Sequence, residues 1–239
     1  MTKKQAFSKG IVDGLPICFG YLSVSFAFGI FSVGCGLSVL EAVLISMTNV
    51  TSAGQLAAVP IIAGGGTLIE LAVSQLVINL RYALMSVSLS QKLDDQVKLR
   101  DRFLIAFVNT DEVFAVASSQ EGRVGKGYMF GLILTPFLGW SAGTLVGAVA
   151  GHLLPDVVIS ALGLAIYGMF IAIVLPKAKK HRPTASCVLI AVALGCGFRY
   201  LPPLQQVPSG FSIIICAVIA AAVMAWLRPV EQEAGNESV

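Results

Sequence analysis

The side chains best suited to bind a polar solute lie inside apolar stretches of this sequence. Arg81 is near the middle of the apolar run 71–89, and Asn79 precedes it by two residues. Arginine keeps its proton, so a guanidinium roughly 15 Å deep in a membrane needs an anionic or carbonyl partner. Such residues usually mark the path of a substrate or an ion. Arg81 and Asn79 are therefore candidate substrate-binding residues, with an internal ion pair or an interfacial Arg81 as alternatives.

A second group of polar residues interrupts the apolar run 38–63. In hydrocarbon, such groups need hydrogen-bond partners, and a broken helix that offers free amides and carbonyls to a ligand supplies them. The alternative is a tight helix contact made through small polar residues. The candidate substrate-binding residues of this group are Asn49, Thr51, Ser52, Gly54 and Gln55.

Two adjacent acids, Asp111 and Glu112, interrupt the apolar run 103–118. Neighbouring residues on a helix point about 100° apart, so both carboxylates cannot face one small site. One of them can pair with Arg81 while the other meets water. The alternative is an interfacial segment with both acids solvated.

Composition places these residues in a membrane protein. The 239 residues are 56% apolar and 12% charged, with a mean hydropathy of +0.84, which leaves too few charges to cover a water-soluble domain. Long stretches without Asp, Glu, Lys or Arg can each hold the roughly 20 residues of a membrane-crossing helix. We predict an all-α, polytopic membrane protein of seven to eight hydrophobic segments.

The predicted domain organisation is simple. A cytoplasmic N-terminus (1–9) precedes one transmembrane helical domain (10–227), and a polar tail (228–239) follows it. The hydrophobic segments are predicted at about 10–36, 38–63, 71–89, 103–118, 127–150, 157–175, 184–198 and 209–227. Within the fifth segment, Gly143, Gly147 and Gly151 recur every four residues, which favours close helix packing.

Charge places constraints on the topology. If all eight segments cross, the loop 91–102, with four basic residues, lies opposite the basic cluster 177–182, against the positive-inside bias. If segments 38–63 and 157–175 are re-entrant instead, the basic regions share one face. Gly29, Arg81 and Tyr82 recur 118 residues later as glycine, arginine and tyrosine. This indicates possible repeats at about 10–90 and 127–200, inverted if segment 103–118 crosses once between them.

Several kinds of chemistry lack their motifs. The sequence has no H-E-x-x-H, no G-x-S-x-G, no complete Walker A and no Cys/His metal spacing. We therefore expect no enzyme activity, no cofactor and no metal site. The net charge of +3 is small and spread through loops, which gives no case for nucleic-acid binding. A transporter of this kind would be driven by a gradient or by its substrate's own concentration.

Ordered motifs across nearly the whole chain resemble the AzlC-like branched-chain amino acid permeases, the large subunits of two-component exporters. These motifs are Gly14-Leu15-Pro16, Gly20-Tyr21, Ala27-Phe28-Gly29, Ser52-Ala53-Gly54-Gln55, Asn79-Leu80-Arg81-Tyr82, Thr110-Asp111-Glu112-Val113-Phe114-Ala115, Leu138-Gly139-Trp140, Gly143-Thr144 with Gly147, and Met169-Phe170-Ile171-Ala172. One departure is Gly163-Leu164, where many members carry an Asp-Phe pair.

The resemblance implies a multi-pass protein of the bacterial inner membrane that exports Leu, Ile, Val and related amino acids such as Met. It also implies a small hydrophobic partner subunit of the AzlD type and coupling to an ion gradient, with a proton as the expected ion. The alternatives are a transporter of another small solute and a membrane scaffold subunit that transports nothing.

The candidate residues suit a zwitterionic substrate. A carboxylate needs a cation or a helix N-terminus, which Arg81 or the amides near residues 52–55 can supply. The ammonium group or a coupling proton needs an acid, for which Asp111 and Glu112 are the candidates.

Overall fold

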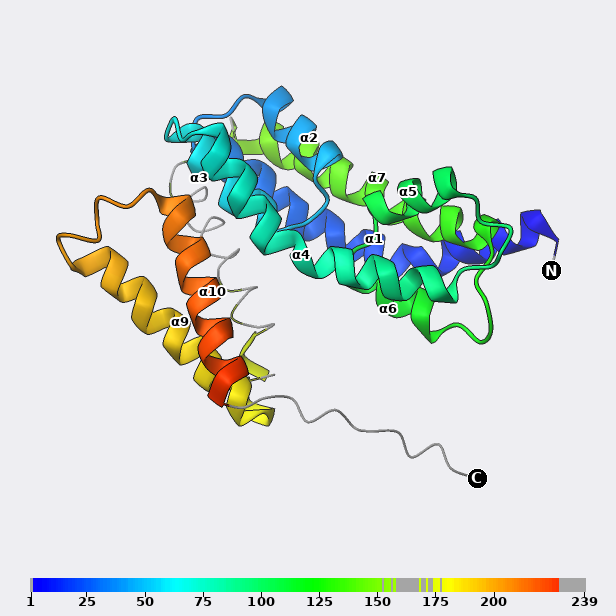
Figure 1. The fold of residues 1–239 in the computed structure, drawn as a ribbon. Coiled ribbons are helices and arrows are strands. Elements are labelled where there is room, and N and C mark those ends of the chain that lie inside the picture. The colour runs from blue at the N-terminus through cyan, green and yellow to red at the C-terminus, as the bar shows by residue number, and fades with distance from the viewer. Residues whose placement is uncertain are drawn as a thin grey trace. The chain divides into compact units, whose positions relative to one another are not determined.

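The computed structural model describes residues 2–151, 153–155, 157, 168, 171, 174–176 and 178–227. These residues form helices and turns, with one isolated β-bridge between Leu93 and Val124. They divide into two compact units, residues 1–167 and 168–239. The first unit contains α1 (Lys3–Gly34), α2 (Val39–Thr48), α3 (Ala53–Ala63), α4 (Leu68–Lys92), α5 (Leu99–Phe107), α6 (Asp111–Ser119) and α7 (Lys126–Gly151), and the second contains α9 (Arg182–Tyr200) and α10 (Ser209–Leu227) (Figure 1).

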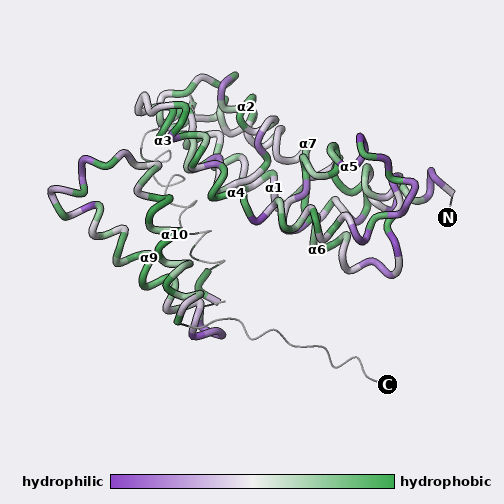
Figure 2. Tube along the Cα trace, viewed as in Figure 1, coloured by the Kyte–Doolittle hydropathy of each residue, from purple (hydrophilic) through white to green (hydrophobic). Residues whose placement is uncertain are grey.

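Five of the described helices, α1, α4, α7, α9 and α10, are long and apolar enough to cross a membrane. Figure 2 shows hydrophobic residues running along α10 and the helices of the first unit. The prediction of an all-α membrane protein is therefore confirmed. The count of seven to eight segments is not confirmed, because two predicted segments are broken into short helices and most of segment 157–175 lies outside the described residues.

Helix α1 begins at Lys3, inside the stretch 1–9 that was predicted as a separate terminus. Thr2 explains this start, because its side chain accepts a hydrogen bond from the Gln5 amide while the Gln5 side chain accepts one from the Thr2 amide. Such a reciprocal cap satisfies two backbone donors of the first turn. The prediction of one domain over 10–227 stays a prediction.

Helices α1 and α7 form a parallel pair whose backbones lie in contact. Gly131 faces Phe7, Gly139 faces Cys18 and Gly147 faces Phe26, so positions advance together along both helices. A methyl group on any of these three glycines would overlap backbone atoms of α1. Small residues permit this approach, and the predicted packing face at Gly143 and Gly147 is confirmed against a helix of the same chain.

Helices α2 and α3 double back beside this pair. The first begins five residues after α1 ends, and the second ends five residues before α4 begins. Their interruption at 49–52, the first tip, contacts the middle of α4, where Asn49 Nδ2 donates to Gln75 Oε1 at 3.1 Å. The expected break in segment 38–63 is therefore present.

Helices α5 and α6 double back from the opposite end of the unit. Asp101 in the first turn of α5 pairs with Lys126 at the start of α7, and Gln120 after α6 accepts from Lys9 of α1. Between them lies an interruption at 108–110, the second tip. Thr110 begins the new helix there, because its hydroxyl accepts a hydrogen bond from the Val113 amide.

This arrangement differs from the single crossing expected of segment 103–118. Because α5 and α6 start and end at the same side, α7 runs in the same direction as α1. The inverted relation between 10–90 and 127–200 is therefore not confirmed. A hydropathy profile cannot separate one crossing from two half-length helices of nine residues each.

In the second unit, α9 and α10 pack side by side, joined by the turn 201–208 (Figure 1). Arg199 lies in the last turn of α9, as expected for a residue at a segment end. A positive side chain there complements the negative end of the helix dipole.

The α1–α7 contact predicts that Gly147→Leu destabilises the protein. The new side chain would meet the Phe26 carbonyl, and overpacking of this kind costs about 1–3 kcal/mol or more. Thermal unfolding in detergent measures the loss. Gly20→Leu is the matched control, because no atom of another helix lies within 4 Å of the Cβ position of Gly20. Equal unfolding temperatures for both variants would contradict the packing argument.

The Asp101–Lys126 pair predicts a stability that depends on pH. The Lys126 ammonium, 2.6 Å from the Asp101 carboxylate, holds the pKa of that carboxyl below its ordinary value. This stabilisation is present above the unfolded-state pKa of about 4 and is lost as pH falls through the lower folded-state pKa. Asp101→Asn removes this component of the acid dependence in thermal unfolding from pH 7 to 3. Asp95→Asn, at an exposed ion pair with Arg123, is expected to keep it.

Candidate functional site

Four polar side chains lie on one face of α4 and connect both tips. Gln75, Asn79, Tyr82 and Ser86 are spaced by four, three and four residues, which places them on a single stripe of a helix. Gln75 and Tyr82 contact the first tip, and Ser86 contacts the second. We name this set the α4 polar stripe.

Gln75 is the centre of the contacts with the first tip. Its Nε2 donates to the Gly54 carbonyl at 2.9 Å, and its Oε1 accepts from both Asn49 Nδ2 and Asn79 Nδ2, at 3.1 and 3.0 Å. Asn49 Oδ1 in turn accepts from the Thr51 hydroxyl at 2.8 Å. The half-buried side-chain amide of Gln75 therefore joins four of the candidate residues, Asn49, Thr51, Gly54 and Asn79.

A larger residue at position 54 would displace the side chains that meet there. A Cβ there would lie 2.7 Å from Gln75 Oε1 and 3.1 Å from Asn79 Nδ2. The neighbouring Ser52 has a positive φ of 51°, a strained conformation for a residue with a side chain. The tip is thus a sharp turn held against α4 by amide hydrogen bonds.

Gln55 belongs to a different contact from the other candidates of the first tip. Its side chain is fully buried, and its Nε2 donates to Ser46 Oγ at 2.9 Å. Ser46 Oγ lies 2.6 Å from Thr144 Oγ1 of α7. Gln55 Oε1 accepts from the Ser52 amide at 3.3 Å. These bonds fasten α2 and α3 to the α1–α7 pair, and none of them involves the α4 polar stripe.

Arg81 pairs with Asp111 at the start of α6. Their closest atoms are 2.5 Å apart, and the side chains are 51% and 46% exposed. The Arg81 guanidinium also donates to the Tyr82 hydroxyl at 3.0 Å and lies over the Tyr82 ring, 4.7 Å from its centre. The Tyr82 hydroxyl donates onward to the Thr51 carbonyl at 3.4 Å. One of the two adjacent acids therefore pairs with Arg81, as expected, and this contact is also the internal ion pair that the sequence left open as the alternative to substrate binding at Arg81.

Glu112 has a different partner from Asp111. Its carboxylate accepts a short hydrogen bond from the Tyr21 hydroxyl of α1. Tyr21 is buried and packs edge-on against Trp140 of α7, with ring centres 5.0 Å apart at 75°. The two acids are therefore separated, one facing a cation on α4 and the other a neutral phenol on α1.

Apolar side chains of both tips lie beside these polar groups. Val50 of the first tip and Val108 of the second belong to one buried cluster with Tyr21 and Trp140. A solute with an apolar side chain would thus meet hydrocarbon next to charge.

Three buried polar atoms close to these residues lack a hydrogen-bond partner. They are Asn79 Oδ1, Asn109 Oδ1 and Trp140 Nε1, and Thr135 Oγ1 is a fourth farther along α7. Buried polar atoms are nearly always paired, so unpaired atoms of this kind point to a ligand or water that completes them. Among the described residues no group of His, Cys, Asp or Glu could hold a metal ion.

Sequence reasoning missed five residues of this site, namely Tyr21, Gln75, Tyr82, Ser86 and Asn109. The i, i+4, i+7, i+11 spacing of the α4 polar stripe was a signal that could have found three of them. The candidates Asn49, Thr51, Gly54, Asn79, Arg81 and Asp111 are joined by the contacts above, whereas the Ser52 side chain makes no cap hydrogen bond.

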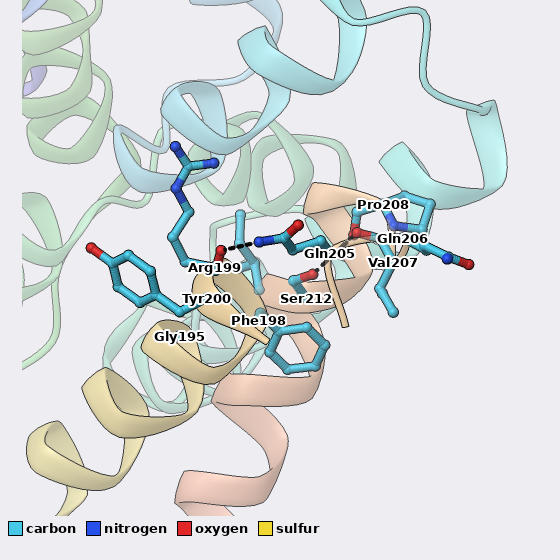
Figure 3. A pocket seen from close by; sticks show the side chains of 10 residues that line it. Gly195, Phe198, Arg199, Tyr200, Gln205, Gln206, Val207, Pro208 and Ser212 are labelled. Carbon is cyan, nitrogen blue, oxygen red and sulfur yellow. Dashed lines mark hydrogen bonds between the residues drawn. The ribbon is translucent and has the colours of Figure 1, made fainter. Parts of the chain in front are cut away.

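A separate pocket lies within the second unit, between the end of α9 and the turn 201–208. In Figure 3 the side chains of Arg199 and Tyr200 extend away from this turn. Gln205 Nε2 donates to the Arg199 carbonyl at 2.8 Å, so the turn satisfies its own polar groups. The pocket therefore lacks the convergent side chains found in the first unit.

Comparison with known proteins identifies the family of this chain. The family model of the AzlC protein matches residues 16–154, which include both tips and the α4 polar stripe. The chain belongs to the AzlC family. An uncharacterized membrane protein of Archaeoglobus fulgidus is 34% identical over 196 residues, covering 81% of this chain and 86% of its own. The inner membrane protein YgaZ of Escherichia coli is 28% identical over 235 residues, covering 95% and 94%. No solved structure matches the chain.

This AzlC family member is a multi-pass membrane protein. Most of the motif at 169–172, and the departure at 163–164, lie outside the residues that the structure describes. The resemblance stated from the sequence is confirmed by the family match.

The Arg81–Asp111 pair predicts a measurable coupling energy. Arg81→Gln leaves Asp111 without its cation, which we expect to cost on the order of 1 kcal/mol for a half-exposed pair. The double variant with Asp111→Asn is expected to recover part of this loss in thermal unfolding. The control is the same comparison of single and double variants at Arg123 and Asp95, which are also 2.5 Å apart but more exposed. A coupling energy no larger than that of the control would remove the special role of the Arg81–Asp111 pair.

Proposed function

We propose that this protein is a membrane transporter that exports branched-chain or other apolar amino acids, namely Leu, Ile, Val and Met. Membership of the AzlC family is consistent with a membrane transporter. The observation that carries the proposal is the Arg81–Asp111 pair at the middle of a 25-residue helix, beside two helix interruptions. Charges at that position are costly in a membrane and are typical of a transport path.

The pair suits a substrate carboxylate. A carboxylate that approaches Arg81 can replace Asp111, because both offer the same bidentate acceptor to the guanidinium. The Tyr82 hydroxyl, which accepts from Arg81, keeps the guanidinium in place during the exchange. The apolar side chain of the substrate would lie against the cluster that contains Val50 and Val108.

The helix directions support alternating access. The helices α2, α3 and α4 form a series of two short helices and one long helix. The helices α5, α6 and α7 repeat this series, and they start from the opposite end of the unit. Opposed halves of this kind, with interrupted helices meeting between them, are a common transporter plan. In this proposal the inverted halves are residues 39–92 and 99–151. Each of the two tips moves away from the site in turn, which opens the site first to one side of the membrane and then to the other.

The remaining acid provides the coupling. Glu112 faces the neutral Tyr21 hydroxyl and none of the described cations forms an ion pair with it. It can therefore carry a coupling proton, or bind the substrate ammonium, without breaking an existing ion pair. Transport would be driven by an ion gradient, with a proton as the proposed ion.

The setting of the proposed transporter is the bacterial inner membrane. Its Escherichia coli relative is named an inner membrane protein. We further propose that a small hydrophobic subunit of the AzlD type completes the transporter. Exposed apolar side chains on α4, such as Leu76, Leu80 and Leu84, offer a surface for lipid or for such a subunit.

Efflux from loaded membrane vesicles tests the function. Vesicles with the protein and its small partner, preloaded with one radiolabelled amino acid each, are expected to lose Leu, Ile, Val and Met faster than Asp or Lys. Arg81→Gln and Arg81→Lys are expected to lower that efflux at least tenfold with unchanged membrane abundance, because lysine cannot form the same bidentate contact.

Ser90→Ala is a control on the same helix, since the Ser90 hydroxyl bonds only its own helix at the Val87 carbonyl. Efflux of all solutes at one rate would favour another substrate. Full activity of both Arg81 variants would remove this residue from the mechanism.

A further inference from the structure

The orientation of three side-chain amides around the first tip is fixed by one backbone atom. The Gly54 carbonyl can only accept a hydrogen bond, so Gln75 must present Nε2 to it. Gln75 Oε1 then faces Asn49 and Asn79, and each of these must present its Nδ2 donor group. None of these three side-chain amides can be reversed without placing two acceptors or two donors against each other.

This chain of bonds turns Asn79 Oδ1 into a permanent acceptor with no donor. The atom is buried and unpaired, although the other end of the same amide is bonded. A carbonyl oxygen left dry loses the hydrogen bonds that it made in water. A water molecule or another group with N–H or O–H bonds that approaches this atom would restore the missing hydrogen bond.

The position of Asn79 relates this acceptor to the rest of the site. Asn79 lies one helical turn from Tyr82, on the same stripe, and its amide touches the Cβ position of Gly54 at the first tip. Arg81 points to a different side of α4, toward Asp111. A donor for a carboxylate and an acceptor for an ammonium group are thus both present on α4, two residues apart in the sequence.

We propose that Asn79 Oδ1 binds the ammonium group of the transported amino acid, and that Gln75 is the residue that positions it. This assignment rests on the proposed transport function and adds the amine subsite to it. A carboxylate is excluded at this atom, since two acceptors repel. The strong N–H donors of an ammonium group fit an acceptor that is held open by its own hydrogen-bond chain.

Asn109 Oδ1 is a second unpaired acceptor, at the second tip, on a side chain that is 3% exposed. Its amide donates to Ser86 Oγ, a hydroxyl that can also donate, so its orientation is not fixed in the same way. Ser86 lies seven residues from Asn79, roughly 10 Å along α4. One ammonium group cannot reach both acceptors at once, and the assignment is therefore made to Asn79 alone.

The test compares two ligands that differ only at the amine. Leucine and 4-methyl-2-oxopentanoate share the carboxylate and the side chain, but the oxo acid has no N–H donor. Binding to the purified full-length protein is measured by the rise in unfolding temperature with ligand concentration. The wild type is expected to prefer leucine. Asn79→Leu, of similar size, is expected to weaken leucine binding about 10- to 100-fold and to leave the oxo acid unchanged.

Gln75→Leu tests the positioning role. This variant keeps Asn79 but releases its orientation, so the ratio of leucine to oxo acid affinity is expected to fall. The ratio compares two ligands within one variant, which makes it independent of any loss of stability. Ser90→Ala is the control and is expected to keep the wild-type ratio.

Three results would overturn the assignment. Asn79→Leu could weaken both ligands by the same factor, or it could keep the full preference for leucine. Sodium chloride could stabilise the wild type but not Asn79→Leu, while both proteins bind leucine equally well. This result would show that Asn79 Oδ1 binds a metal cation and not the ammonium group. A wild type that binds neither ligand, in contrast, contradicts the proposed function itself and the amine subsite with it.

Discussion

The structure depends on the need of every polar group in a membrane interior to find a partner within the protein. Where the helices stop at residues 49–52 and 108–110, backbone groups lose their regular partners. Side chains of α4 contact the first of these stretches, where Gln75 accepts a hydrogen bond from the Asn49 side chain and Tyr82 donates one to the Thr51 carbonyl. An interruption of this kind is stable only because α4 carries polar residues at the matching heights.

The parallel pair of α1 and α7 provides the frame for these interruptions. Glycines along α7 bring the two backbones into contact, so the pair occupies little width. Ser46 and Thr144 then join α2 to this frame, and Tyr21 and Trp140 form its wall beside Glu112. The glycines of α7 thus permit the polar contacts that α2 and α6 make with this frame. A larger side chain between α1 and α7 would displace the two tips as well.

Sequence reasoning predicted the class of fold and the pairing of Arg81 with an acid, and it missed the other side-chain contacts and the direction of two helices. Arg81 and its acidic partner could be predicted because a charge in an apolar run stands out by itself. Gln75 could not be singled out, because its importance comes from the Gly54 carbonyl that it meets, which is 21 residues away. The doubling back of α5 and α6 was missed, since charge counts and hydropathy are the same for one crossing and for two half-length helices.

Adjacent acids in one short helix have separate partners because of the helical geometry. Asp111 and Glu112 begin α6 and point about 100° apart, so one faces α4 and the other α1. A movement of α6 that separates Asp111 from Arg81 must therefore also alter the contact of Glu112 with Tyr21. In the proposed transport cycle, a solute that displaces Asp111 from Arg81 would in this way also affect the contact between Glu112 and Tyr21. Such a link between two sites, carried by one rigid element, is what a coupled transporter requires.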